Sequence, residues 1–92
     1  MFVKREVIHT PGLFFIALEY GVKAFLKYSL DGNVLIVELT YTPKKYRGKG
    51  LAEELTRKAI EYAKIKKLKI KPLCNYAAMF FQKHPEYQNL LE

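Results

Sequence analysis

Two closely spaced glycines within a group of basic side chains form a loop whose residue types suit an anionic ligand. Glycines let backbone N–H groups approach an anion closely, and the N-terminus of a helix adds partial positive charge. We therefore interpret the loop as a diphosphate site, although an isolated R-G-x-G would more often be a plain turn with solvated lysines. It lies after an apolar segment and before an amphipathic one, and comprises Thr42, Pro43, Lys44, Lys45, Tyr46, Arg47, Gly48, Lys49, Gly50, Leu51 and Ala52.

Cys74 and Glu38 are the two side chains with the types needed for acyl or proton transfer. Cys74 falls at the start of an expected helix, where the helix N-terminus and nearby lysines would lower the pKa of a thiol. It is either an acyl-accepting nucleophile or a small buried apolar residue. Glu38 lies in an apolar strand, where burial would raise its pKa towards that of a base for an amine. The alternative is an edge-facing or lysine-paired carboxylate.

Neither histidine has partners at metal-ligand spacing, and no carboxylate cluster suggests a metal. His9 is expected at the surface, in a turn beside Pro11 and Gly12. His84 precedes Pro85 and is expected to cap or support the last helix, with a role as a base the alternative. The sequence therefore predicts no metal site.

The elements that must position these residues follow from hydrophobic periodicity. The segment 34–42 is continuously apolar and is expected to be a strand buried on both faces. An apolar face at helical spacing predicts a helix from Gly50 to about Lys66, and a second helix is expected over 75–83. The other strands are expected over 2–8, 13–20, 22–30 and 68–73. This order predicts an α+β fold with a mixed α/β sheet, an antiparallel strand meander followed by a βαβ unit.

Length and composition bound the class of protein. Ninety-two residues, half of them apolar, predict one domain over 1–92 with a packed core. A lone cysteine, a charged N-terminus and the absence of a long apolar run predict a cytoplasmic protein without a signal peptide or membrane span. The net charge of +7 favours anionic partners. Five lysines over 64–71 suit either a nucleic-acid surface or a solvated helix end, and no nucleic-acid-binding motif accompanies them.

Several short motifs occur in a fixed order along the chain. The segment 45–50 fits a Q/R-x-x-G-x-G/A pattern, with Lys45 in the place of Gln or Arg. Others lie at 39–43 (LTYTP), 47–52 (RGKGLA), 72–74 (PLC) and 84–87 (HPEY), and a G-x-x-A-x-x-x-Y spacing joins Gly21, Ala24 and Tyr28. On these motifs the chain resembles the GNAT N-acetyltransferase superfamily, and more closely its small stand-alone YjdJ-type subgroup.

The resemblance implies a GNAT-like fold, acetyl-coenzyme A (acetyl-CoA) as cofactor, and an amine acceptor of unknown identity, either a small amine or a protein amine. It also implies that the strand ending at Thr42 and the strand over 68–73 are parallel neighbours that splay apart. Pantetheine would pair with backbone groups in that gap, and a backbone amide near Tyr41 would polarise the thioester. The implied cofactor contacts are Tyr41, Thr42, Lys45, Tyr46, Arg47, Gly48, Lys49, Gly50, Leu51, Ala52 and Asn75.

Two positions depart from the family patterns. Leu39 stands where the subgroup usually has a histidine, and Gln82 stands where the superfamily often has a tyrosine acid. The expected function is an acetyl-CoA-dependent N-acetyltransferase. The alternatives are a CoA-binding protein without transferase activity and a basic nucleic-acid-binding domain. A chain this short has little material for an acceptor pocket, which a homodimer could supply.

Overall fold

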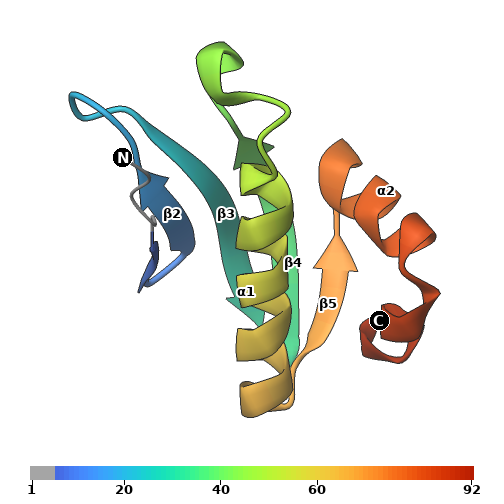
Figure 1. Ribbon diagram of the computed structural model, residues 1–92. Helices are drawn as coiled ribbons and strands as arrows, with labels where there is room; N and C mark the ends of the chain where they lie inside the picture. Colours follow the sequence, from blue (N-terminus) through green and yellow to red (C-terminus); the bar gives the residue numbers. More distant parts are fainter. Residues whose placement is uncertain (1–5) are drawn as a thin grey trace.

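The computed structural model describes residues 6–92 and shows a five-stranded sheet with helices packed against one face (Figure 1). The strand order is β1-β2-β3-β4-β5, antiparallel from β1 to β4 and parallel between β4 and β5. This confirms the predicted antiparallel meander followed by a βαβ unit. The elements are β1 (Val7–Thr10), β2 (Leu13–Ala17), β3 (Lys23–Asp31), β4 (Val34–Tyr41), η1 (Lys44–Tyr46), α1 (Leu51–Lys66), β5 (Lys69–Pro72), α2 (Asn75–Lys83) and η2 (Pro85–Leu90).

Helix α1 follows the predicted boundaries and supplies one wall of the core. Its apolar stripe packs across the sheet, and Figure 1 shows it crossing in front of β3 and β4. Helix α2 and η2 flank β5 and also contact α1, because Arg57 of α1 lies over the Phe80 ring and donates to the Tyr87 hydroxyl. Both helices therefore cover the same side of the sheet. The buried side chains of α1 are Leu51, Leu55, Thr56, Ala59, Ile60 and Ala63.

The expectation that the strand over 34–42 is buried on both faces is wrong. Leu35 and Val37 are buried against the helices, whereas Val34 and Ile36 are only half-buried on the other face. No helix within residues 6–92 covers that second face, and its half-buried apolar residues produce the continuous run seen in the sequence. We call it the open face. Within residues 6–92, no helix is long and apolar enough to cross a bilayer.

A β-bulge interrupts the pairing of β3 with β4. Lys27 pairs with Leu39 and Tyr28 with Val37, which leaves Glu38 as the extra residue. The bulge places Glu38 and Leu39 in succession at exposed positions, so the alternation of buried and exposed residues breaks there. The sequence pattern does not reveal the bulge, because the segment around Glu38 is apolar on both sides and shows no clear alternation that an extra residue would interrupt.

His9 lies in strand β1 rather than in the predicted turn, because β1 continues to Thr10 and the turn comprises Pro11 and Gly12. Residues 2–5 of the strand expected over 2–8 lie outside the described residues. His9 is exposed, as expected, but its ring stacks on Phe14 at 4.0 Å between centroids. Its Nε2 shares a hydrogen bond of 2.5 Å with the Tyr28 hydroxyl. Packing against these rings desolvates the imidazole and lowers its pKa from the usual 6.5.

Stability is expected to fall in mild acid in part because of His9. A histidine whose pKa is lower in the folded state binds fewer protons than in the unfolded chain. Its contribution is therefore complete above pH 6.5 and is lost as the pH falls from 6.5 towards the folded pKa. Melting temperatures at pH 7.5 and 5.5 check this, with His9→Gln as the variant. The loss on acidification should be smaller in His9→Gln, and equal losses would contradict the assignment.

Candidate functional site

Strands β4 and β5 stop pairing halfway along β4. Their pairing runs from Val34–Lys69 to Val37–Pro72 and then stops. The carbonyl oxygen of Val37 accepts from the amides of both Leu73 and Cys74, at 3.0 and 3.2 Å, which turns the chain away after β5. Beyond Val37, strand β4 continues to Tyr41 paired with β3 alone. The splayed parallel pair predicted from the sequence is therefore present.

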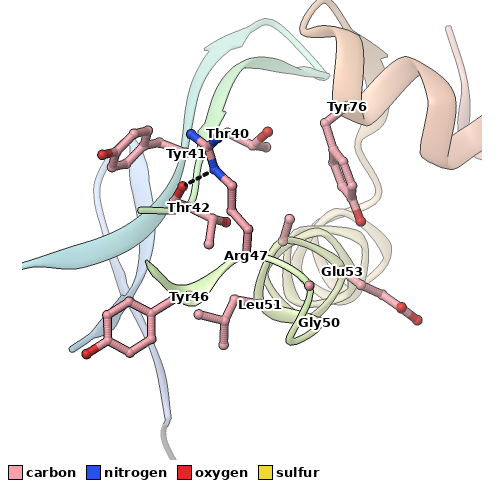
Figure 2. A pocket seen from close by; sticks show the side chains of 11 residues that line it. Thr40, Tyr41, Thr42, Tyr46, Arg47, Gly50, Leu51, Glu53 and Tyr76 are labelled. Atoms are coloured by element: carbon pink, nitrogen blue, oxygen red, sulfur yellow. Dashed lines mark hydrogen bonds between the residues drawn. The ribbon is translucent and has the colours of Figure 1, made fainter. Parts of the chain in front are cut away.

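A cavity of about 420 Å³ opens beside the unpaired end of β4 (Figure 2). It lies between that strand end, the loop into α1, the first turn of α1 and the first turn of α2. Its walls are formed by Thr40, Tyr41, Thr42, Tyr46, Arg47, Gly48, Gly50, Leu51, Ala52, Glu53 and Tyr76. The glycine loop and the splayed strand thus meet in a single cavity.

The two glycines give the loop its shape. Gly48 and Gly50 both have φ of +80°, a conformation that L side chains rarely adopt. Gly50 is the residue before α1, and its carbonyl accepts from the amide of Glu54 at 3.0 Å. A Cβ atom at either glycine would meet nothing within 4 Å, so the space beside them is open. The amides of the first turn of α1 have no partner within the helix and are free to bind a ligand here.

Charged residues of the loop divide between the cavity and its outer rim. Arg47 lines the cavity, and its Nε donates to the carbonyl of Thr42 at 2.9 Å, which closes the loop (Figure 2). Lys45 instead pairs with Glu19 of the β2–β3 loop at 2.6 Å, and hydrogen bonding to that carboxylate raises the pKa of Lys45. Glu53 is the one carboxylate in the cavity wall, and Arg57 holds it at 2.9 Å. Its negative charge is thereby partly offset.

Three of the predicted cofactor contacts do not line the cavity: Lys45, Lys49 and Asn75. Lys45 is held by Glu19, and both Lys49 and Asn75 are exposed. The structure brings the other eight together in the cavity wall, namely Tyr41, Thr42, Tyr46, Arg47, Gly48, Gly50, Leu51 and Ala52.

Cys74 is the N-cap of α2 and lies at the splay. Its Sγ accepts from the amide of Ala77 at 3.4 Å and is 3.9 Å from the Thr40 hydroxyl across the gap. It is half-buried and is not among the residues that line the cavity, so both interpretations of its role stay predictions. The sequence does not predict this hydrogen bond at the helix N-terminus, because cysteine is not among the usual N-cap residues.

Glu38 is exposed, so the expectation that it is buried in an apolar strand is wrong. It is the bulged residue of β4 and is exposed, with the Ser29 hydroxyl donating to its carboxylate at 2.8 Å. Ser29 pairs with Ile36 on the open face, which places Glu38 on that face as well. Glu38 does not line the cavity. Its surroundings match the edge-facing alternative better than a buried base.

Tyr76 is a cavity residue that sequence reasoning missed. It is half-buried, and its ring reaches from α2 towards the first turn of α1, opposite β4 (Figure 2). Desolvation, and secondarily the negative charge of Glu53, raise the pKa of Tyr76, so the phenol stays protonated and can donate. The sequence predicts Asn75 as the contact at this helix start, whereas the next residue, Tyr76, lines the cavity. Gln82, at the position of the superfamily's tyrosine acid, is exposed on α2 and does not line the cavity.

The arrangement defines a class of protein: a mixed sheet with a splayed strand pair and a glycine loop at a helix N-terminus. The model of the GCN5-related N-acetyl-transferase family matches residues 13–90. The chain belongs to this family, which confirms the resemblance seen in its motifs. The NMR solution structure of a GCN5-like protein from Staphylococcus aureus superposes with a TM-score of 0.72 and 24% identity, over 95% of this chain and 87% of that chain. At this identity the likeness shows the fold.

Proposed function

We propose that the protein is an acetyl-CoA-dependent N-acetyltransferase that binds its cofactor in the cavity at the end of β4. One observation carries the proposal: the glycine loop at the start of α1 and the unpaired end of β4 line the same cavity. A coenzyme A molecule has a diphosphate that suits the first and an extended amide chain that suits the second. Family membership supports acyl transfer as the chemistry.

Each part of the cavity has a distinct task in this proposal. Backbone amides from Arg47 to Ala52, with the partial charge of the α1 N-terminus, hold the diphosphate. Backbone groups of Tyr41 and Thr42 pair with the pantetheine chain as an added strand would. The protonated hydroxyl of Tyr76 donates to the cofactor from the opposite wall. These donors match an acceptor-rich, anionic ligand.

Bound acetyl-CoA supplies an acetyl group already activated as a thioester. A backbone amide near Tyr41 donates to the carbonyl oxygen, where negative charge develops during attack by the amine. The base that accepts the amine proton is not assigned to Glu38, because that carboxylate is exposed on the open face. We also propose a cytoplasmic location, because the lone cysteine cannot form an internal disulfide.

We expect the amine to attack the thioester directly rather than through Cys74. The partners of its Sγ are the Ala77 amide and the Thr40 hydroxyl, and neither is a base able to activate the thiol. Cys74→Ala should therefore keep most of its turnover and show ternary-complex kinetics. Loss of the capping bond should cost about 1 kcal/mol of stability. Release of free coenzyme A on adding an amine measures the turnover and tests the proposed function itself.

Cys74→Ser is the matched control, since its hydroxyl retains an acceptor for the Ala77 amide. It should restore the stability lost in Cys74→Ala. A covalent route predicts the opposite pattern: acetylation of a Cys74 peptide by acetyl-CoA alone, and its release by amine at the rate of turnover. That result would overturn direct attack.

A further inference from the structure

A row of apolar side chains crosses the open face and ends at the candidate cofactor cavity. Ile8 of β1 pairs with Phe15 of β2, Phe15 pairs with Phe25 of β3, and Phe25 pairs with Tyr41 of β4. Residues in register on neighbouring strands share a face and touch, and the Phe25 and Tyr41 ring centroids are 5.5 Å apart. Tyr41 is 45% exposed and also lines the cavity. The row therefore leads from the outer strand to the proposed site of transfer.

Two exposed leucines extend this surface around the point where β4 and β5 part. Leu39 lies on the unpaired half of β4 and is 47% exposed, and Leu73 directly follows β5 and is 58% exposed. Exposed apolar side chains gathered on one face are typical of an interaction site. Because α1 and α2 cover the other side of the sheet, an acceptor can reach the splay from the open face.

Lysine side chains dominate the charge of the open face and favour acidic acceptors over cationic ones. Lys23 and Lys27 flank Phe25 on β3, and the Lys23 ammonium lies 5.1 Å from the Phe15 ring centroid. Lys71 joins them, since it pairs with Ile36. Glu38 is the carboxylate near the splay, and Asp31 lies at the far end of β3. With a net charge of +7 on the whole chain, the face repels small cationic polyamines and attracts acidic partners.

We propose that the acceptor is a polypeptide amine flanked by acidic and apolar residues, which docks across the open face. This proposal rests on the proposed function. The row spans four strands, or about 14 Å at ~4.8 Å per strand, and so matches roughly four residues of an extended chain rather than a small amine. Nucleic acid is the less suitable occupant. Glu38 lies on this face near the splay, and its carboxylate would repel phosphate.

Peptides with one free lysine amine test the proposal. The first has Asp, Glu and Leu around the lysine, the second replaces the acidic residues with Arg, and spermidine is the third acceptor. Acetylation is followed by mass spectrometry. The acidic peptide should have a kcat/KM at least ~10-fold above that of the basic one, equivalent to about 1.4 kcal/mol. Lys23→Glu with Lys27→Glu should remove this preference. Lys66→Glu with Lys83→Glu, an equal charge change on exposed helical positions, should keep it.

The outcomes separate this proposal from the proposed function. If acetyl-CoA does not raise the melting temperature and no acceptor is acetylated, both the proposed function and this inference are wrong. Binding of acetyl-CoA with transfer to spermidine alone, or equally to both peptides, would overturn only the acceptor class. Two further results would also overturn it: an oligonucleotide bound through Lys23 and Lys27, or a homodimer that Lys23→Glu with Lys27→Glu dissociates. A monomeric protein that acetylates the acidic peptide in preference to the basic one supports the proposal.

Discussion

Gly50→Asp is expected to weaken coenzyme A binding by roughly a thousandfold while the protein stays folded. Gly50 has φ of +80°, and a side chain there enters open space beside the start of α1. A carboxylate about 4 Å from a phosphate charge costs about 4 kcal/mol near a protein surface, which equals roughly a thousandfold in Kd. Titration calorimetry measures the affinity, and circular dichroism confirms the fold.

Gly50→Asn is the matched control for backbone strain. Asn and Asp have the same shape and both tolerate the left-handed conformation better than most residues. Both variants therefore carry a similar strain, about 1–2 kcal/mol. Only the Asp variant adds negative charge, so it should bind far more weakly than the Asn variant. Equal affinities in the two variants would mean that the loop is an ordinary turn.

Phe81→Ala is expected to have the largest effect on stability. Phe81 is 2% exposed and packs edge-on against Phe80 and near Tyr87, so it anchors α2 to the core. Removing a buried phenyl ring costs about 3–5 kcal/mol, and each kcal/mol lowers the melting temperature of so small a domain by roughly 4–8 °C. We expect a fall of at least ~12 °C by calorimetry.

Met79→Ala on the same helix is the control, because Met79 is 46% exposed. It should shift the melting temperature by only a few degrees, since exposed substitutions usually change stability by about 0.5 kcal/mol or less. Similar shifts in both variants would show that α2 is not anchored through Phe81. The anchoring matters for function, since α2 carries both Cys74 and Tyr76 to the splay.

The fold and the glycine loop were predictable because local patterns determine them. The helical spacing of apolar residues gave α1 its boundaries, and the change of period at Gly50 located the loop. The strands expected over 22–30 and 34–42 correspond to β3 and β4, which join through a turn at Gly32 and Asn33, where Gly32 has φ of +60°. Each of these features depends on residues close together in the chain.

The errors concern features that depend on distant residues. Lys45 turns from the cavity because Glu19 lies 2.6 Å away, across 26 positions of sequence. Glu38 is exposed because it lies on the open face, which no helix within residues 6–92 covers, and the bulge opposite Lys27 and Tyr28 turns Leu39 to the same face. Tyr76 lines the cavity because the chain turns after β5, at Leu73 and Cys74, and α2 begins beside the end of β4. No local pattern encodes these relations, so only the folded chain reveals them.

Amide chemical shifts of the labelled protein, recorded during titration with acetyl-CoA, test the central claim most directly. The account predicts that the largest changes fall on Tyr41, Thr42, Arg47 to Ala52 and Tyr76, around the cavity at the end of β4. A duplex of equal phosphate content should not reproduce them. Changes centred on the lysines over 64–71, or the same changes with the duplex, would contradict a cofactor site in this cavity.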